Sequence, residues 1–228
     1  MPTDGTAFFV VTIDGPAGAG KSTVSRRVAE KLGYIFLDTG ALYRSVALLA
    51  SRNNLSSSDE GGISEIARTL EVRFEHHSQV LRIIANGEDV SAAIRTSEIS
   101  QFSSQASAHP EVRRALLVAQ RRVALSGSLV AEGRDVGTVV FPDAQAKFFL
   151  TASPETRAMR RTLEMAQLGA VVAYEEVLKE IKERDERDSG RETAPLRQAT
   201  DAILVDSSDQ SAEEVITFMV DLVRKRGG

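Results

Sequence analysis

The sequence predicts an α/β fold in which helices flank a parallel sheet, with a small antiparallel insert. Over the first fifty residues, short apolar runs alternate with segments of helical spacing, the pattern of strands joined by crossover helices. A Gly-rich turn directly follows the first apolar run. After residue 62 the pattern changes to alternating apolar and polar residues, which is typical of antiparallel strands.

The first two predicted strands and helices follow each other closely. Residues 8–13 (FFVVTI) form an apolar run that ends at Gly-Pro, typical of a short strand buried on both faces. Residues 21–32 carry apolar side chains at every fourth position, which predicts a helix, and residues 34–37 form a second strand. A further helix is expected to begin at Thr39 or Gly40.

The antiparallel insert is predicted over residues 63–96, after a polar, loop-forming stretch at residues 53–62. Residues 70–74 and 80–84 alternate or nearly so, and an Asn-Gly turn dipeptide follows them. The later elements are expected in the order helix 110–124, strand 129–131, strand 148–150, helix 154–167, helix 174–188, strand 202–205 and helix 212–225. Five short apolar strands are thus available for one parallel sheet, in a single domain over residues 1–228.

Composition excludes several classes of protein. The chain has no Cys, which removes disulfides, thiolate metal sites and Cys nucleophiles. Its net charge is −4, so nucleic acid is not an expected partner. No window approaches the roughly eighteen apolar residues of a membrane span, and the first nine residues lack the basic charge of a secretory signal. We expect a cytoplasmic protein, a monomer, with no membrane partner.

Arginine is over-represented in this acidic chain. Lys and Arg total 28, of which 22 are Arg. Arg is suited to planar, forked recognition of phosphate and carboxylate. Composition alone favours codon or lineage bias over phosphate handling as the explanation, so the positions of the arginines have to decide.

The residues from Gly15 to Ser22 (GPAGAGKS) fit the pattern G-x-x-x-x-G-K-[ST] between the first predicted strand and helix. Such a loop turns backbone N–H groups inward around phosphate oxygens, its Lys contacts the β- and γ-phosphates, and its Ser can ligate Mg²⁺. The following helix N-terminus favours the same anion. The motif predicts binding of the phosphates of a nucleoside triphosphate through Gly15, Ala17, Gly18, Ala19, Gly20, Lys21, Ser22 and Thr23.

Two more motifs follow buried strands, where ligands of open α/β sheets bind. LDTGALYR ends at Arg44, which is within reach of a phosphate held over the sheet, although a helix-surface position explains Arg44 equally well. In AEGRD, Glu132 is placed like the acid that holds Mg²⁺ through water, Arg134 could fork onto a phosphate, and Asp135 could accept from the N4 amino group of cytosine. A purely structural Arg–Asp pair is the alternative.

The chain resembles the bacterial cytidylate kinases, a family of P-loop nucleoside monophosphate kinases. Four motifs in the expected order carry the resemblance: TIDGPAGAGKST (12–23), LDTGALYR (37–44), AEGRDVGTVVFPDA (131–144) and EIKERDERDSGRETAPL (180–196). Residues 70–95 are similar to this family's enlarged monophosphate-binding lobe. The resemblance implies a P-loop NTPase three-layer sandwich with a core at residues 6–55 and 108–228, an NMP-binding insert at about 56–107 and a mobile lid at about 155–192.

The resemblance also implies roles for individual residues. It places Thr39 and Arg44 on the monophosphate, Ser104, Arg113 and Asp135 on the cytosine edge, and Arg134 on a phosphate; Arg184, Asp188 and Arg191 would contact ribose and phosphate, and Arg157 and Arg161 are lid arginines. Its expected catalytic set is Lys21, Arg134, Arg157, Arg161 and Arg191. Without the resemblance, the segment 180–191 would be read as a solvated helix face with i,i+4 ion pairs.

Three departures from the family pattern affect these roles. Thr39 stands where many relatives have Ser and keeps its hydroxyl, and Ser22 stands where many have Gly and restores the general P-loop consensus. Glu132 stands where Asp is common, which adds a methylene and leaves open whether Glu132 or Asp38 holds Mg²⁺ through water. Ser22 and Glu132 are therefore the candidate metal ligands.

The implied activity is transfer of the γ-phosphoryl group of ATP to CMP or dCMP, with Mg²⁺, in pyrimidine nucleotide metabolism. The alternative is another P-loop small-molecule kinase, of the UMP, dTMP or shikimate type. A GTPase-like switch is disfavoured, because none of the chain's three Asn is followed by the Lys-x-Asp of the guanine-reading motif. The preference between CMP and dCMP and the tolerance of UMP stay open.

Overall fold

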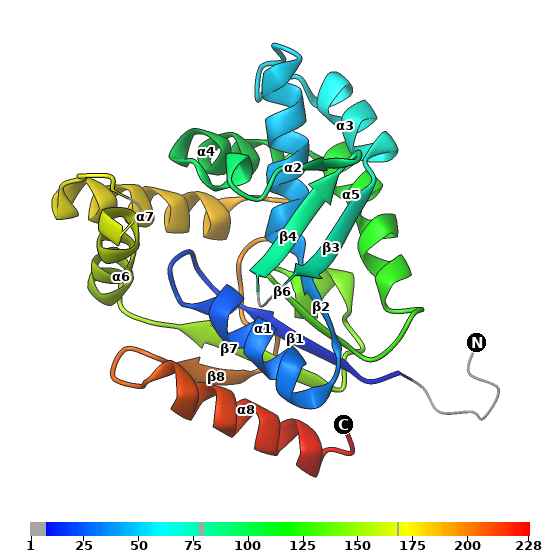
Figure 1. Ribbon diagram of the computed structural model, residues 1–228, viewed down its shortest axis with the longest axis vertical. Coiled ribbons are helices and arrows are strands. Elements are labelled where there is room, and N and C mark those ends of the chain that lie inside the picture. Colours follow the sequence, from blue (N-terminus) through cyan, green and yellow to red (C-terminus); the bar gives the residue numbers. More distant parts are fainter. Residues whose placement is uncertain (1–7, 78–79, 168) are drawn as a thin grey trace. The chain divides into compact units, whose positions relative to one another are not determined.

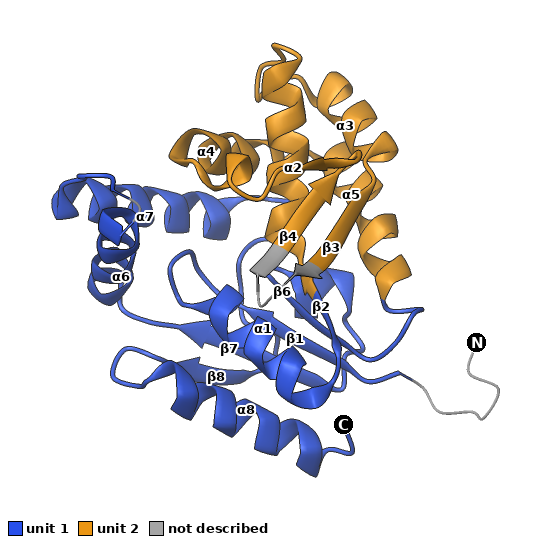
Figure 2. Cartoon of the chain, in the orientation of Figure 1, with its two compact units in different colours: residues 1–36, 124–228 blue, residues 37–123 orange. Residues whose placement is uncertain are grey.

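The computed structural model describes residues 8–77, 80–167 and 169–228 (Figure 1), so residues 6–7 of the predicted core lie outside it. Side chains are described for these residues except at 76–77 and 80–81. The chain divides into two compact units, unit 1 (residues 1–36 and 124–228) and unit 2 (residues 37–123), coloured separately in Figure 2. Their boundary falls within strand β2, and each unit is described by itself.

Unit 1 is built on the parallel sheet that the sequence predicts. The sheet has the order β2-β6-β1-β7-β8, formed by Ile35–Asp38, Leu129–Gly133, Val10–Asp14, Ala146–Thr151 and Ile203–Asp206. The central strand β1 pairs in parallel with β6 and β7, with Ile13 opposite Glu132 and Phe148. Leu129, Val130 and Ala131 are fully buried, which explains why β6 reads as a continuous apolar run.

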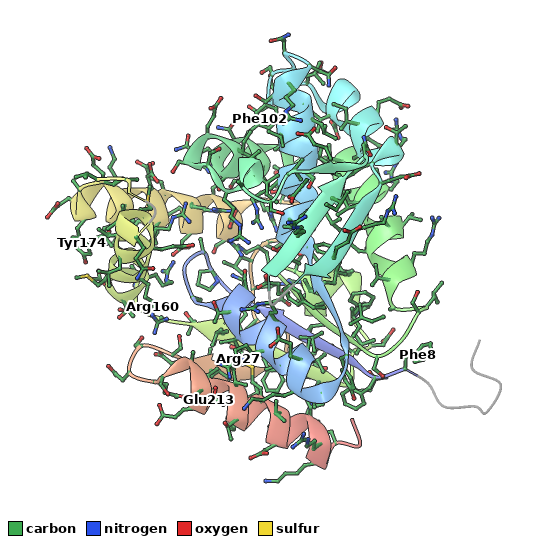
Figure 3. All side chains as sticks on the ribbon, viewed as in Figure 1. Phe8, Arg27, Phe102, Arg160, Tyr174 and Glu213 are labelled. Atoms are coloured by element: carbon green, nitrogen blue, oxygen red, sulfur yellow. The ribbon has the colours of Figure 1, made fainter. Side chains whose placement is uncertain are left out.

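Helices flank this sheet, as predicted (Figure 1). The helices of unit 1 are α1 (Lys21–Leu32), α6 (Pro154–Gln167), α7 (Tyr174–Gly190) and α8 (Ala212–Lys225), of which α6 and α7 pack on each other. Helix α1 packs on α8, and Figure 3 shows Arg27 and Glu213, which form an ion pair of 2.9 Å between these helices. Every predicted strand and helix of unit 1 is present, with bounds that differ by two residues at most.

Unit 2 contains the predicted antiparallel strands and more helix than expected. Its sheet has the order β3-β4-β5, formed by Val72–His77, Val80–Ala85 and Glu88–Asp89. Its helices are α2 (Thr39–Arg52), α3 (Glu60–Thr69), the short 3₁₀ helix η1 (Ala93–Arg95), α4 (Ser97–Ala106) and α5 (Pro110–Val123). One face of the small sheet packs on α2 and α4 in a core formed by Ala41, Ala47, Leu48, Ile83, Ala85, Val90, Ile94 and Ile99.

Helices α3 and α4 were not predicted. Asp59 caps α3 by accepting from the Gly62 amide at 2.9 Å, and Ile63 and Ala67 then bury one face of the helix. The polar, Gly-containing run before Ile63 reads as a loop because it holds the cap and the exposed first turn. Thr96 caps α4 in the same way through the Ile99 amide. In both helices few apolar residues face the core and many polar residues surround them, so the sequence pattern does not predict a helix.

The part of the chain that the structure describes holds no helix long and apolar enough to cross a membrane.

Helix α8 begins with a capping box, whose loss gives a clean test of local stability. Ser211 accepts from the Glu214 amide while the Glu214 carboxylate accepts from the Ser211 amide at 2.8 Å. We expect Ser211→Ala to lower the free energy of unfolding by about 1 kcal/mol, because one amide of the first turn loses its partner. Urea denaturation measures this. Ser126→Ala, at an exposed serine of the connection before β6, is the control, and an equal loss in both variants would contradict the capping role.

Candidate phosphate-binding site

The residues between β1 and α1 fold into a loop that faces a helix N-terminus. Gly15 has a φ of 152°, and a Cβ there would lie 1.9 Å from the Leu150 carbonyl oxygen, so only glycine fits beside β7. Gly20 is the N-cap of α1 and brings no side chain to the first amides of the helix. Ser22 and Thr23 are exposed in that first turn. The loop therefore leaves backbone N–H groups and the positive end of α1 available to an anion.

Lys21 is the cation of the phosphate loop, and its pKa is strongly perturbed. Its side chain is buried, and its ammonium group donates to the Pro16 carbonyl at 2.7 Å. Burial, followed by the nearby Arg134 guanidinium, lowers the pKa of Lys21 well below its usual value, and Glu132 only partly opposes this. A lysine in this setting is stabilised in its charged form by an additional negative charge. A polyphosphate beside the loop would supply that charge.

Strand β6 carries its acids directly into this region. Glu132 is 2% exposed, and Asp135, just beyond the strand, is 6% exposed. Asp135 lies 3.8 Å from a guanidinium nitrogen of Arg191. The Glu132 charge also acts on Lys21, which places this acid near the loop. The strand end thus joins the phosphate loop to a second set of charged groups.

That second set is an Arg–Asp cluster centred on Asp188 of α7. Arg134 donates to the Asp188 carboxylate at 2.9 Å, and Arg184 lies 3.8 Å from the same oxygen. Burial would raise the pKa of Asp188, but Arg134 and Arg184 together hold it below its usual range. Arg191 donates to the Ala194 carbonyl at 2.6 Å. Three arginines named for substrate contact, Arg134, Arg184 and Arg191, therefore lie in one part of unit 1. Asp188, also named for substrate contact, is their shared counter-charge.

The two predicted lid arginines of α6 have different surroundings. Arg157 has a side chain only 4% exposed, donates to both oxygens of Asp185 on α7, and also donates to the carbonyls of Ala152 and Ala17. Because Ala17 belongs to the phosphate loop, Arg157 ties α7 to that loop through α6. Arg161, by contrast, is partly exposed and lies 3.6 Å from Glu164 on the same helix.

In unit 2, Asp38 and Arg44 form a pair at the start of α2. One oxygen of Asp38 accepts from the Ala41 amide at 2.8 Å and the other accepts from Arg44 at 2.9 Å. Thr39 is 5% exposed in the first turn of the same helix. The pair holds the Arg44 guanidinium over the N-terminal turn, where an anion would meet both the arginine and the helix dipole.

Ser104 and Arg113 meet through Ser107 in the same unit. Arg113 donates to the Ser107 carbonyl at 3.1 Å, and the Ser107 hydroxyl donates to the Ser104 carbonyl at 2.9 Å. The Arg113 guanidinium also lies over the Tyr43 ring, 5.6 Å from its centre. Unit 2 therefore assembles its predicted substrate-contacting residues on α2, α4 and α5, with Tyr43 as a neighbour.

The chain offers oxygen donors that fit Mg²⁺ beside the loop. The Ser22 hydroxyl is exposed in the first turn of α1, and the Glu132 carboxylate is close enough to act on Lys21. Hard oxygen ligands in small number suit Mg²⁺, which keeps several waters. Both oxygens of Asp38 are already engaged by Ala41 and Arg44, so Asp38 fits less well. Among the described residues, no group of three or more His, Cys, Asp or Glu could hold a metal ion.

Three residues of these sites were not singled out from the sequence. Tyr43 supports Arg113, Asp185 holds Arg157, and Asp14 at the end of β1 accepts from two backbone amides. Asp14 carries the same signal that points to Glu132, a carboxylate at the end of a buried strand. Asp185 carries no such signal, because it lies in a charged helix run.

Loss of the Asp185 carboxylate should weaken the attachment of α7. We expect Asp185→Asn to lower the free energy of unfolding by about 2 kcal/mol, because the buried Arg157 guanidinium loses its bidentate, charged partner. The loss is moderate because Asp185 is partly exposed, so solvent screens the pair. Urea denaturation gives the value. Glu183→Gln breaks an exposed pair with Lys179 on the same helix and should change stability by less than about 0.5 kcal/mol. Similar values for the two variants would contradict this role of Asp185.

Comparisons with known proteins bear on the whole chain. The Cytidylate kinase family model matches residues 11–225. The chain is 48% identical over 217 residues to a protein named Cytidylate kinase from Citrifermentans bemidjiense, covering 95% of this chain and 93% of that one. It is also 48% identical over 226 residues to the Cytidylate kinase of Geobacter sulfurreducens, covering 99% and 97%.

A solved structure supports the fold alone. An uncharacterized protein from Eubacterium ventriosum matches with a TM-score of 0.51 at 13% identity, covering 95% of this chain and 98% of that one. The family match and the two relatives extend over both units, including the phosphate loop, the β6 strand end and α7. The resemblance drawn from the four motifs is therefore confirmed, and the chain belongs to the cytidylate kinase family.

Proposed function

We propose that this protein transfers the γ-phosphoryl group of ATP to CMP or dCMP, giving ADP and CDP or dCDP. The observation that carries the proposal is its identity of 48% over almost its full length to proteins named cytidylate kinase. The buried cations around the phosphate loop support a polyphosphate donor. Such an enzyme serves pyrimidine nucleotide metabolism.

Phosphate-to-phosphate transfer requires few chemical groups from the protein. Phosphoryl transfer passes through a loose transition state, so catalysis consists mainly of positioning the reactants and neutralising charge. The acceptor is already a phosphate anion, and no general base is required. Lys21 and the loop amides hold the β- and γ-phosphates of ATP, and the adjacent Arg134 neutralises charge that develops on the transferred group.

Specific side chains are proposed to hold the acceptor. Arg44, aimed over the first turn of α2 by Asp38, binds the acceptor phosphate together with Thr39. Asp135 accepts from the exocyclic amino group of cytosine, a donor that uracil lacks. Five further residues extend these contacts: Ser104 and Arg113 on the base, and Arg184, Asp188 and Arg191 on the ribose and phosphate.

Segment 155–192 acts as a lid in this proposal. Its partly exposed Arg161 leaves its contact with Glu164 and turns toward a transferring phosphate, whereas Arg157 reaches the loop carbonyl of Ala17 and steadies the loop itself. Closure of a lid excludes water, whose attack would waste ATP. Both arginines then serve the transferring group, Arg161 by contact and Arg157 at the loop.

Mg²⁺ is the proposed metal, bound together with ATP. Ser22 would hold it directly and Glu132 would hold it through water, as their oxygen chemistry allows. When bound, Mg²⁺ neutralises charge on the β- and γ-phosphates. We also propose that the protein works as a cytoplasmic monomer, which sedimentation at assay concentrations tests for the oligomeric state.

A substrate panel decides between this function and the alternative of another P-loop small-molecule kinase. In a coupled ADP-release assay with ATP and Mg²⁺, we expect turnover with CMP and dCMP well above that with UMP, AMP, dTMP or shikimate. The low rates expected with UMP and dTMP follow because the Asp135 carboxylate favours a base with an exocyclic amino group, which uracil and thymine lack. A CMP rate no higher than the ATPase background would refute the function, and a preference for dTMP, UMP or shikimate would establish the alternative.

Asp135→Ala should separate reading of the base from binding of ATP. We expect kcat/KM for CMP to fall about 10- to 100-fold, the value of one good polar contact to a base edge. The KM for ATP should change by less than about twofold, because Asp135 makes no proposed contact to it. Asp143→Ala, at an exposed acid a few residues on, is the control. Equal losses for CMP and ATP would remove Asp135 from the base-reading role.

A further inference from the structure

The turn that follows β6 carries Arg134 and Asp135, and it has an unusual backbone. After β6 the chain forms a single π-helical turn, η2 (Val136–Val140), with Asp135 as its N-cap. The Asp135 carbonyl accepts from the Val139 amide at 2.8 Å and from the Val140 amide at 3.3 Å. A π-helical turn is rare and occurs often at functional sites. Its first amides need acceptors, because they have no partner within the turn.

Asp135 does not cap this turn with its own side chain, although Asp is a preferred N-cap residue. The cap comes from another strand. Asp14, the last residue of β1, accepts from the Val136 amide at 2.8 Å with one carboxylate oxygen and from the Gly137 amide at 2.7 Å with the other. Both distances are those of strong, charge-assisted hydrogen bonds. The Asp135 carboxylate is thereby spared from capping and lies 3.8 Å from Arg191.

The packing around this contact is close. In the parallel register, Asp14 lies opposite Gly133, one residue before Arg134. A Cβ on Gly137 would lie 2.7 Å from the Thr12 hydroxyl oxygen and 3.2 Å from a carboxylate oxygen of Asp14, so the turn can approach β1 only with glycine there. Asp14 is 4% exposed. These contacts fix the height and direction of the turn relative to β1.

Keeping a carboxylate at this position is costly, which argues for a specific use. Burial raises the pKa of Asp14 to about 6, although the amides of Gly137 and Val136 lower it. Asp135 also raises it and Lys21 lowers it. At neutral pH the group is still ionised and remains an acceptor for both amides. The Lys147 ammonium, on the neighbouring β7, is paired with Asp201 rather than with Asp14.

We propose that Asp14 is a positioning residue for the base-reading segment: its carboxylate caps η2 in place of Asp135 and so aims Arg134 and Asp135 at the acceptor nucleotide. Asp14 also directly precedes Gly15, so the same side chain sets the spacing between the start of the phosphate loop and the base-reading turn. This inference rests on the proposed function, in which Asp135 distinguishes cytosine from uracil.

The test measures base discrimination as well as rate. In Asp14→Asn the side chain keeps its shape but has one acceptor oxygen for two amides. We expect kcat/KM for CMP to fall about tenfold, the size of one lost charge-assisted hydrogen bond, with a much smaller change in the KM for ATP. The ratio of kcat/KM for CMP to that for UMP should fall as well, because a displaced Asp135 loses the contact that only cytosine offers.

Ser211→Ala is the matched control, since it removes a helix cap of unit 1 that has no role in the proposed mechanism. It should lower stability while leaving the CMP to UMP ratio unchanged. A purely structural role for Asp14 predicts the same behaviour for Asp14→Asn, and an unchanged ratio in that variant would overturn the inference. Absence of CMP turnover in the unsubstituted protein would instead refute the proposed function.

Gly137→Ala provides a second route if Asp14→Asn does not fold. Its Cβ, 2.7 Å from the Thr12 hydroxyl oxygen, pushes the turn away from β1 while residue 14 remains an aspartate. We expect the same loss of base discrimination, and the double variant Asp14→Asn/Gly137→Ala should lose little more than either single variant, because both act through one contact. Additive losses, or a Gly137→Ala protein with full discrimination, would overturn the inference.

Discussion

Several positive charges lie close together beside the phosphate loop, and unit 1 has to compensate for their repulsion. Lys21 is buried close enough to Arg134 and Arg184 for both to lower its pKa, a costly arrangement in a low-dielectric setting. The protein offsets part of this cost with acids: Glu132 acts on Lys21, and Asp188 pairs with Arg134. In the proposed function a triphosphate neutralises the remaining positive charge, so the charges that are costly to bury would also attract the substrate.

Carboxylates at strand ends are used to place the segments that follow them. Asp38 ends β2, accepts from the Ala41 amide and holds Arg44. Asp14 ends β1 and caps a turn that belongs to β6. In each case one acid accepts from backbone amides that need a partner, and the same carboxylate lies beside a side chain that we propose binds the substrate. One carboxylate thus both provides a hydrogen-bond acceptor for backbone amides and positions a nearby side chain.

Much of this could be predicted because the signals are local. The strands of the parallel sheet are short apolar runs, and the loop that ends at Lys21 and Ser22 follows a fixed pattern. The parts that escaped prediction depend on partners distant in sequence. Asp14 meets Gly137 across 123 positions, and Arg157 meets Asp185 through the packing of α6 on α7. Helix α3 escaped for a different reason, because its cap and first turn are as polar as a loop.

The arginine excess has two uses that composition could not separate. Arg134 and Arg184 surround Asp188 in the region proposed to hold phosphates. Arg157 instead donates to Asp185 and to two backbone carbonyls. Arg160, labelled in Figure 3, donates to the hydroxyl and the carbonyl oxygen of Ser207. A planar fork suits both tasks, because carboxylates, carbonyls and phosphates all present oxygens that it can bridge. Lysine, a point charge, could replace neither use without loss of a partner, so an acidic net charge is compatible with a phosphate-handling protein in which many arginines are paired internally.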